Sequence, residues 1–470
     1  MTGSETEGHG PRLDFHGGLA GAFLPLFLFA AAVVFVTMAG MITIQAYFAP
    51  LVIIIGVVIL LAKDRTRACG AMLEGVQDRT LTVMIFAFLG AGVFGQLLVT
   101  SGLVETIVWL GNLTGVRGTA FVLLCFSVSA VISTSIGTST GTVVTCVPVL
   151  FPAGVLLEAH AGLVLGAIYS GARFGDNLAP ISDTTIASAF TQGAEVGEVV
   201  ATRIKYAIAA ALGSVLLYVV AGAALGPGDY EIGAGLAAPA AENPRPEALW
   251  MLLAPAATIF LCLRGRALIH ALWCGIFMAI VVGLGTGTLT LSALYSITPP
   301  RDVGGAITSG LVGMRDVVFL AILIMAILGA LRRAGALEET GRAISRFATT
   351  PKRAELSIFG LVSVMCPLCA GNTPAMLFTG PLVKEIGERF SIHRTRRANL
   401  MDLAGNGVTE NLPHINTMLA LAAVMIAAHE ATGAPLVPMT TVGLLAFHPI
   451  MLSLVGIMAI ATGWGSRRSA

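Results

Sequence analysis

Long runs of apolar residues dominate the chain, and many of them span about 20 residues, the length that crosses a bilayer as a helix. Other runs are shorter or are interrupted by Gly, Pro, Ser, Thr and Asn, and these fall in two clusters, at residues 119–192 and 355–428. The pattern predicts an all-α polytopic membrane protein in which some segments do not cross alone. The predicted membrane segments are residues 19–40, 42–62, 81–100, 119–136, 143–157, 161–176, 200–225, 248–263, 267–284, 317–331, 355–370, 373–383, 398–428 and 440–461.

The two clusters align without a gap when the sequence is shifted so that Thr184 falls on Thr417, and Asp183 then falls on Asn416. The matched prolines and threonines indicate an internal repeat, which is common in transporters. Other identical pairs under this shift are Gly102 and Gly335, Glu105 and Glu338, Phe126 and Phe359, Thr140 and Thr373, Pro148 and Pro381, His160 and His393, and Pro180 and Pro413.

Loop charges predict opposite orientations for the two copies, since short cytoplasmic loops carry an excess of Lys and Arg. Residues 63–80 and 332–353 are basic and should face the cytoplasm, whereas residues 101–118, 226–247 and 285–316 should face outside. Residues 101–118 align with residues 332–353, so the two copies must be inverted in the membrane.

The predicted architecture is therefore two inverted repeats of about five transmembrane helices each, with re-entrant hairpins and broken helices at mid-membrane. One of the segments 119–157 and 161–192 is the hairpin and the other the broken helix, and the sequence does not choose between them.

The opening residues have no basic region, so we expect no cleaved signal peptide. The predicted divisions are a cytoplasmic tail (1–18), the first repeat (19–225), an external linker (226–247), the second repeat (248–461) and a final tail (462–470).

Composition agrees with a membrane protein and narrows the function. Of 470 residues, 56% are hydrophobic and 11% are charged, where a soluble domain carries about 25% charged residues. The net charge of +1 gives no footprint for nucleic acid. Six of the seven cysteines lie in apolar runs, where they should pack as small hydrophobic residues. We expect the lipid bilayer and not nucleic acid as a partner, and a homodimer stays open.

Of the 26 acidic residues, 22 fall in the tail, in loops or near the ends of spans and are expected to be solvated, and the four that do not are Asp176, Asp183, Asp402 and Glu410. A charge at mid-bilayer is unfavourable by at least about 2.5 kcal/mol, so each of the four needs a partner or a function. If the chain is helical there, Arg173 and Asp176 share a face and could neutralise one another. Asp183 follows Pro180, which bends the chain and frees carbonyl oxygens beside the carboxylate. Hard cations prefer that mixture of oxygens.

The stretch SGARFGDNLAPISDTTIASA, at residues 170–189, resembles the signature of the NhaC-type sodium/proton antiporters, members of the ion-transporter superfamily. LMDLAGNGVTENLPHINT (400–417) is similar to a second motif of that family, and GTSTGT (137–142) and GNTP (371–374) resemble its polar bends. The resemblance implies a secondary transporter whose core moves by an elevator-like displacement. It also implies a site near Asp176, Asn177, Asp183, Thr184, Asn416 and Thr417. The chain departs from the family at His414 and Ile415, where the family tends to have Trp, and at Glu410, an added acid.

A cation exchanger needs a buried carboxylate that binds either a proton or a metal ion, because competition then couples the two fluxes. We predict this role for Asp183 and Asp176, with sodium at Asp183 and Thr184. Hydroxyl groups of Ser182, Thr138, Ser139 and Thr140 would add oxygen ligands. Asp402 and Glu410 would form a second proton site, unless they lie solvated at a helix end. The remaining candidates for the ion and proton site are Asn177, Asn372, Thr373, Asn411, His414, Asn416 and Thr417. His414 could carry a proton or could hydrogen-bond within the core. No resident cofactor is expected, because sodium and protons are cargo.

Two other functional classes remain open. The first is a sodium- or proton-coupled carrier of a small organic acid or amino acid, whose carboxylate could be held by Arg173 and half-helix N-termini. The second is an intramembrane aspartyl protease, because residues 174–176 superficially resemble a membrane G-x-G-D motif. Arg173 does not fit that motif, and a second catalytic Asp is not evident. We therefore predict a transporter, and no enzyme, in the cell membrane with a cytoplasmic N-terminus.

Overall fold

The computed structural model describes residues 12–38, 44–180, 182–226, 245–264, 266–298, 302–335, 339, 343–369 and 371–466. The chain divides into two compact units, each of which is described by itself. Unit 1 comprises Met1–Thr82 and Phe319–Ala343, and unit 2 comprises Val83–Val318 and Ile344–Ala470. All the candidate site residues predicted from the sequence fall in unit 2.

Unit 1 combines apolar helices with one amphipathic helix. Its elements are α1 (Gly18–Met38), η1 (Ile44–Tyr47), α2 (Phe48–Leu61), α3 (Arg65–Val76), the first residues of α4 (Arg79–Thr100) and most of α16 (Arg315–Arg333). α3 approaches α16 at backbone distance, because a Cβ on Gly75 would come within 2.2 Å of Met325 O. An ion pair of 2.6 Å between Arg333 and Glu74 also joins these two helices. α3 is thereby held along α16.

Unit 2 holds the other described helices and a short β-hairpin. Its first half comprises most of α4, then α5 (Leu103–Thr114), α6 (Gly118–Ile136), α7 (Ser139–Leu156), α8 (Ala161–Leu178), α9 (Asp183–Gln192) and α10 (Val196–Leu225). Next come η2 (Pro246–Leu252), α12 (Leu253–Leu263), α13 (Leu268–Thr286), α14 (Leu291–Leu294), β1 (Ser296–Thr298), β2 (Asp302–Gly304) and α15 (Ala306–Gly313). The last part comprises α18 (Pro351–Leu368), α19 (Asn372–Arg389), α20 (Arg394–Gly405), η3 (Val408–Asn411), α21 (Asn416–Thr432), α22 (Met439–Leu445) and α23 (Phe447–Thr462). β1 and β2 are antiparallel, with Ser296 opposite Gly304.

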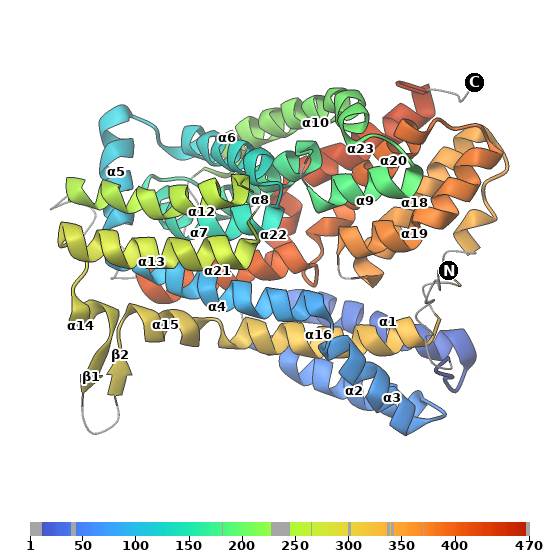
Figure 1. Ribbon diagram of the computed structural model, residues 1–470, viewed down its shortest axis with the longest axis horizontal. Coiled ribbons are helices and arrows are strands. Elements are labelled where there is room, and N and C mark those ends of the chain that lie inside the picture. The colour runs from blue at the N-terminus through green and yellow to red at the C-terminus, as the bar shows by residue number, and fades with distance from the viewer. Residues whose placement is uncertain are drawn as a thin grey trace, which may run out of the picture. The chain divides into compact units, whose positions relative to one another are not determined.

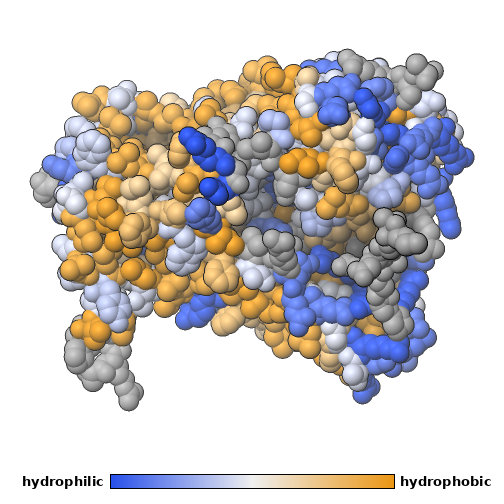
Figure 2. Space-filling model, viewed as in Figure 1, coloured by the Kyte–Doolittle hydropathy of each residue, from blue (hydrophilic) through white to orange (hydrophobic). Residues whose placement is uncertain are grey.

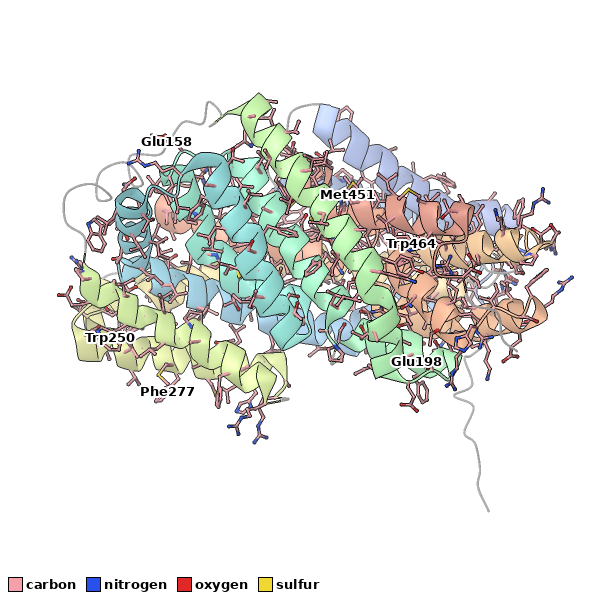
Figure 3. The ribbon with its side chains drawn as sticks, turned by 90° about the horizontal axis from the view of Figure 1, so that it is seen from above. Glu158, Glu198, Trp250, Phe277, Met451 and Trp464 are labelled. Carbon is pink, nitrogen blue, oxygen red and sulfur yellow. The ribbon has the colours of Figure 1, made fainter. Side chains whose placement is uncertain are left out.

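Length and composition mark the helices as membrane-embedded. Among the described residues, four helices are long and apolar enough to cross a bilayer, and the number rises to seven when three bent helix pairs each count as one span. α13 exposes apolar side chains such as Phe277, which points away from the protein in Figure 3. Mainly hydrophobic residues cover the surface over α12 and α13 in Figure 2. By contrast, 83% of α7 is buried. The chain is an all-α polytopic membrane protein, as predicted.

Three regions that were expected to be loops contain regular structure instead. Residues 63–80 contain α3, residues 101–118 contain α5, and residues 285–316 contain α14, the β-hairpin and α15. α5 continues from α4 at an angle of 59°. The predicted segment 398–428 is likewise divided, because η3 separates α20 from α21. These pieces are shorter than a bilayer crossing, so a search for long apolar runs merges or misses them.

The shift that relates the two sequence clusters recurs in the helix boundaries. α6, α7, α8 and α9 begin at residues 118, 139, 161 and 183. α18, α19, α20 and α21 begin at residues 351, 372, 394 and 416, so all four starts are displaced by that same shift. Glu158 and Ser391, the non-glycine residues with positive φ in the described part of the chain, are also equivalent under it. The limits of the two repeats, at residues 19–225 and 248–461, stay predictions.

The structure decides which segment is the hairpin. α6 and α7 pack against each other as a hairpin, whereas α8 and α9 form the broken helix. α8 packs on α6 and α7 of its own copy, but α9 packs on α19 and α20 of the other copy (Figure 1). Conversely, α20 packs on α18 and α19, and α21 packs on α7. Each broken helix thus runs from its own hairpin to the hairpin of the other copy, which is the arrangement of inverted repeats.

Candidate functional site

The first part of the site forms where α8 ends beside the tip of the α6–α7 hairpin. α8 can lie against the backbone of α6, because a Cβ on Gly175 would come within 2.3 Å of Thr134 N. Gly137, with a φ of 74°, ends α6 in the left-handed conformation that glycine tolerates. The Thr138 side chain then caps α7 by accepting a hydrogen bond from Gly141 N. These features bring the start of α7 to the end of α8.

Asp176 lies in the last turn of α8, only 4% exposed, and hydroxyl groups donate hydrogen bonds to its carboxylate. Ser139 Oγ, at the start of α7, donates to Oδ2 at 2.5 Å. Ser182 Oγ, in the break between α8 and α9, donates to Oδ1 at 2.7 Å. Ser182 Oγ also lies 2.9 Å from Thr184 Oγ1. Asp183 begins α9, and its side chain lies outside the described part of the structure.

Asp402, in α20, is fully buried and bonded to four side chains. Asn177 Nδ2 and Asn406 Nδ2 donate to its Oδ1 at 3.0 and 2.6 Å. Ser188 Oγ donates to its Oδ2 at 3.2 Å. Arg203 Nη1, from α10, lies 2.7 Å from the same oxygen. Asp402 is therefore held beside a basic partner, as buried charges generally are.

Glu410, in η3, is fully buried and forms an ion pair with Arg173, whose Nη2 lies 2.5 Å from Oε2. Arg173 Nε also donates to the Tyr169 hydroxyl at 3.3 Å, and Arg173 Nη1 donates to Asn406 Oδ1 at 3.4 Å. Helical spacing predicted that Arg173 and Asp176 could neutralise one another, and the two do interact electrostatically, while the ion pair at 2.5 Å joins Arg173 to Glu410 of the other copy. The guanidinium is thus engaged on all three of its nitrogens.

The charged residues correct two further expectations. α20 ends at Gly405, so Asp402 and Glu410 do not share a helix face, and both are buried rather than solvated at a helix end. Glu355, which was expected to be solvated, is 7% exposed and lies 2.8 Å from Arg396. Buried arginines therefore pair with acidic residues for which the sequence had allowed a solvated position.

The site lies on the pseudo-two-fold axis that relates the two copies. Arg173 and Asn406, which are hydrogen-bonded, are equivalent positions of the two copies, because the shift that aligns the copies places one on the other. The hydrogen bond between Asn177 and Asp402 also has a counterpart in the other copy. Asn177 is equivalent to Glu410, and Asp402 is equivalent to Tyr169. The Tyr169 hydroxyl donates a hydrogen bond to the backbone oxygen of Glu410. A residue can contact its own equivalent only near the axis. The network thus lies at the interface between the two copies.

A set of uncharged polar side chains borders the ionic network. Thr140 Oγ1 lies 3.2 Å from Thr417 Oγ1, which joins the starts of α7 and α21. Asn372 Nδ2, at the start of α19, donates to Asn406 Oδ1 at 3.1 Å. Asn416 lies beside Gly371, where a Cβ would be 3.3 Å from its Nδ2. The members of this set that are half-buried rather than buried are Thr138, Thr140, Asn372, Thr373 and Asn416.

Asn411 and His414 form hydrogen bonds with backbone carbonyls. Asn411 Nδ2 donates to Gly443 O at 2.8 Å, and a ring nitrogen of His414 lies 3.1 Å from Pro367 O. Both side chains are buried. These contacts match the core alternative that was left open for His414.

Arg203 is the principal site residue that the sequence did not single out. The predicted span of residues 200–225 placed Arg203 next to its cytoplasmic end, where a basic residue is usually solvated. α10 in fact begins at Val196, and the Arg203 side chain is fully buried. Glu195 precedes the helix as its N-cap, and Gly193 ends α9. Those two residues were the available signal for an earlier helix start.

Comparisons with known proteins agree with the architecture. A model of the Na+/H+ antiporter family matches residues 15–223 and 247–432. The malate-2H(+)/Na(+)-lactate antiporter of Bacillus subtilis is 22% identical over 367 residues, which cover 76% of this chain and 77% of that protein. The arginine/ornithine antiporter ArcD of Halobacterium salinarum is 26% identical over 392 residues, which cover 78% and 76%. An uncharacterized Na(+)/H(+) antiporter of Haemophilus influenzae is 24% identical over 153 residues, or 32% of each chain.

Proposed function

Because the chain belongs to the Na+/H+ antiporter family, we propose that it exchanges sodium ions for protons at Asp176 by alternating access. Membership in a transporter family also argues for a carrier and against an enzyme. Sodium and protons are the cargo under this proposal, and no resident cofactor is required. The displacement between the two states would be the elevator-like movement that the sequence motifs imply.

The observation that carries the proposal is the environment of Asp176. Asp176 accepts hydrogen bonds from the hydroxyl groups of Ser139 and Ser182 at the meeting point of a hairpin tip and a helix break. A carboxylate with hydroxyl oxygens is a ligand set for a hard cation. The same carboxylate can take a proton when the cation leaves, so the two ions compete for one group.

Asp176→Asn tests this role, because it keeps the shape of the side chain and removes the charge. Purified protein would be reconstituted in vesicles with an internal pH dye, and a sodium gradient would be applied. We expect sodium-driven proton movement in the wild type and a loss of at least about 100-fold in the variant, the scale of a lost essential proton group. Glu158→Gln, at an exposed turn (Figure 3), is the matched control and should behave as the wild type. Normal exchange by Asp176→Asn would remove this residue from the mechanism.

The orientation forms part of the proposal. Exposed basic residues gather at the end of unit 2 that holds the start of α18 and the end of α19, namely Lys352, Arg353, Lys384 and Arg389, and blue residues mark this region in Figure 2. The positive-inside rule assigns this end to the cytoplasm. We propose separately that the protein lies in the cell membrane with a cytoplasmic N-terminus, because the basic residues of 63–80 favour the cytoplasmic side for that loop. A homodimer is compatible with this orientation.

Exchange of a small organic acid or amino acid is the second candidate. Two of the relatives are matched over about three quarters of their length. The name of the Bacillus subtilis protein includes malate and lactate, and the name of the Halobacterium salinarum protein includes arginine and ornithine. The supporting observation is that α19 and α21 begin at the network without a side-chain cap, since their N-cap residues are Gly371 and Ile415. Uncapped helix starts attract a carboxylate. Arg173 cannot serve as the free cation for it, because its donors are already bonded.

The same vesicles distinguish the two candidates. With sodium alone, proton movement supports sodium/proton exchange. If proton or sodium movement appears only after malate, lactate, arginine or ornithine is added, the organic substrate is the cargo. Preloading the vesicles with the same compound then shows whether the transport is exchange.

A further inference from the structure

Arg203 contacts three helices of the site, and the exchange proposed above does not yet assign it a role. Its Nη1 lies 2.7 Å from Asp402 Oδ2 in α20. The same nitrogen donates to Asn177 O in α8 at 2.6 Å and to Thr185 Oγ1 in α9 at 2.9 Å. Nε donates to Asn399 Oδ1, also in α20, at 3.2 Å. One fully buried side chain from α10 therefore joins α8, α9 and α20.

These bonds span the break between α8 and α9. α8 ends at Leu178, so the carbonyls of its last turn lack donors from within the helix, and Asn177 O is one of them. A cation at this position also complements the negative end of the helix dipole. Thr185 lies on the other side of the break. Asp176 lies just before the same break and its partner Ser182 lies within it, so the geometry of the break sets the distance between them.

The equivalent contact in the second copy uses a hydroxyl group in place of the carboxylate. The residues equivalent to Asp402 and Asn177 are Tyr169 and Glu410, and the Tyr169 hydroxyl donates directly to Glu410 O at 2.5 Å. The residue equivalent to Arg203 is Leu436. The arginine at that contact is Arg173, which donates to the Tyr169 hydroxyl and pairs with Glu410. An arginine at the position of Arg203 is therefore not required by the repeated architecture, since the second copy has leucine there.

We propose that Arg203 is a positioning residue for the ion site: it is a fixed internal cation that keeps Asp402 ionised and holds the break between α8 and α9. Asp176 is then the carboxylate at which sodium ions and protons are exchanged. This last clause rests on the proposed function, whereas the pairing of Arg203 with Asp402 does not. The proposal also reassigns Asp402 from proton carrier to permanent counter-ion.

The charges around Asp402 define what should happen when Arg203 is removed. Arg203 faces it from α10, Asp176 and Arg173 lie on α8, Glu410 follows in η3, and Cys366 of α18 lies close enough to interact electrostatically. The Asp183 side chain, on α9, is outside the described structure. Without Arg203, Asp402 is a buried carboxylate without its counter-charge, and it must take up a proton to remain buried.

The experiment compares Arg203→Gln, Arg203→Lys, Asp402→Asn and Arg203→Gln/Asp402→Asn. Arg394→Gln is the matched control, because Arg394 is an exposed arginine whose acidic partner lies 3.5 Å away. Thermal unfolding in detergent would be followed at about pH 5.5 and about pH 8.5, on either side of neutral. Sodium-driven proton flux would be measured in vesicles at the same pH values.

We expect Arg203→Gln to lower the melting temperature relative to the wild type, and to lower it less at the acidic pH than at the alkaline pH. This direction follows because protonation of Asp402 removes the unpaired charge, and the protonated form is lost as the pH rises. Arg203→Lys should keep most of the wild-type behaviour. The double variant should lose the pH dependence, since neither charge remains, but should still raise the KM for sodium about tenfold, because the break is no longer held.

Two results would overturn the proposal. If Arg203→Gln is destabilised equally at both pH values, Arg203 does not hold Asp402 ionised. If the double variant has the wild-type KM, Arg203 does not position the ion site. Absence of sodium-driven flux in the wild type would contradict the proposed function instead, and the unfolding measurements would still test the pairing.

Discussion

At the scale of single residues, the ion pair between Arg173 and Glu410 tests how the two copies are joined. Glu410→Gln removes the charge that faces Arg173 while keeping the size of the side chain. Removing one partner of a buried ion pair typically destabilises a protein by about 3–5 kcal/mol, because the other charge is left buried. We expect a clear fall in melting temperature in detergent, and partial recovery when Arg173→Gln is added. If the two losses simply add, the residues are not coupled.

The sequence pointed to Arg173, Asp176, Asp402 and Glu410 because charges are rare and unfavourable inside apolar runs. It did not predict their partners. Arg173 and Glu410 lie in different copies of the repeat, so their pairing follows from how the two copies pack and not from local spacing. Arg203 escaped notice for a different reason. It lies close to a helix start, where composition does not separate a buried charge from a solvated one.

At the scale of elements, the close approach of α8 to α6 should control the position of Asp176. A Cβ on Gly175 would lie within 2.3 Å of the backbone nitrogen of Thr134, which cannot turn aside as a side chain could. Gly175→Ala should therefore push α8 from α6, with a loss of about 1–3 kcal/mol, and should weaken sodium-driven flux. The readouts are the melting temperature and the flux assay. Gly360→Ala is the control, since a Cβ there meets nothing within 4 Å, and it should be neutral or slightly stabilising. Wild-type values for both variants would show that this approach is not needed.

Most elements could be predicted from apolar runs, because a helix in lipid needs a long apolar surface. α6 and α8 were predicted to begin at residues 119 and 161 and begin at residues 118 and 161. α5 and α9 could not be found in this way, since each has no more than 12 residues and carries polar positions. The choice between hairpin and broken helix also needed the structure. It depends on whether α9 packs back on its own copy or on the other one.

At the scale of the whole protein, the repeat was detectable because prolines and threonines recur at one constant shift, and the helix starts follow the same shift. Low identity did not hide it, since helix breaks and hairpin tips require particular residues while lipid-facing positions accept many. The charges of the loops alone predicted that the two copies are inverted in the membrane. Equivalent residues of the two copies should therefore face opposite sides of the bilayer.

Glu158 and Ser391 are equivalent positions of the two copies, and both are exposed in turns with positive φ, at 60° and 52°. Because the copies are inverted, we expect Glu158 outside the cell and Ser391 in the cytoplasm. Each would be replaced by cysteine in a background from which all seven native cysteines have been removed. A membrane-impermeant maleimide should label Glu158→Cys in intact cells and Ser391→Cys only in inside-out vesicles. Labelling of both from one side would contradict the inverted arrangement, and with it the placement of the ion site on an axis between two opposed halves.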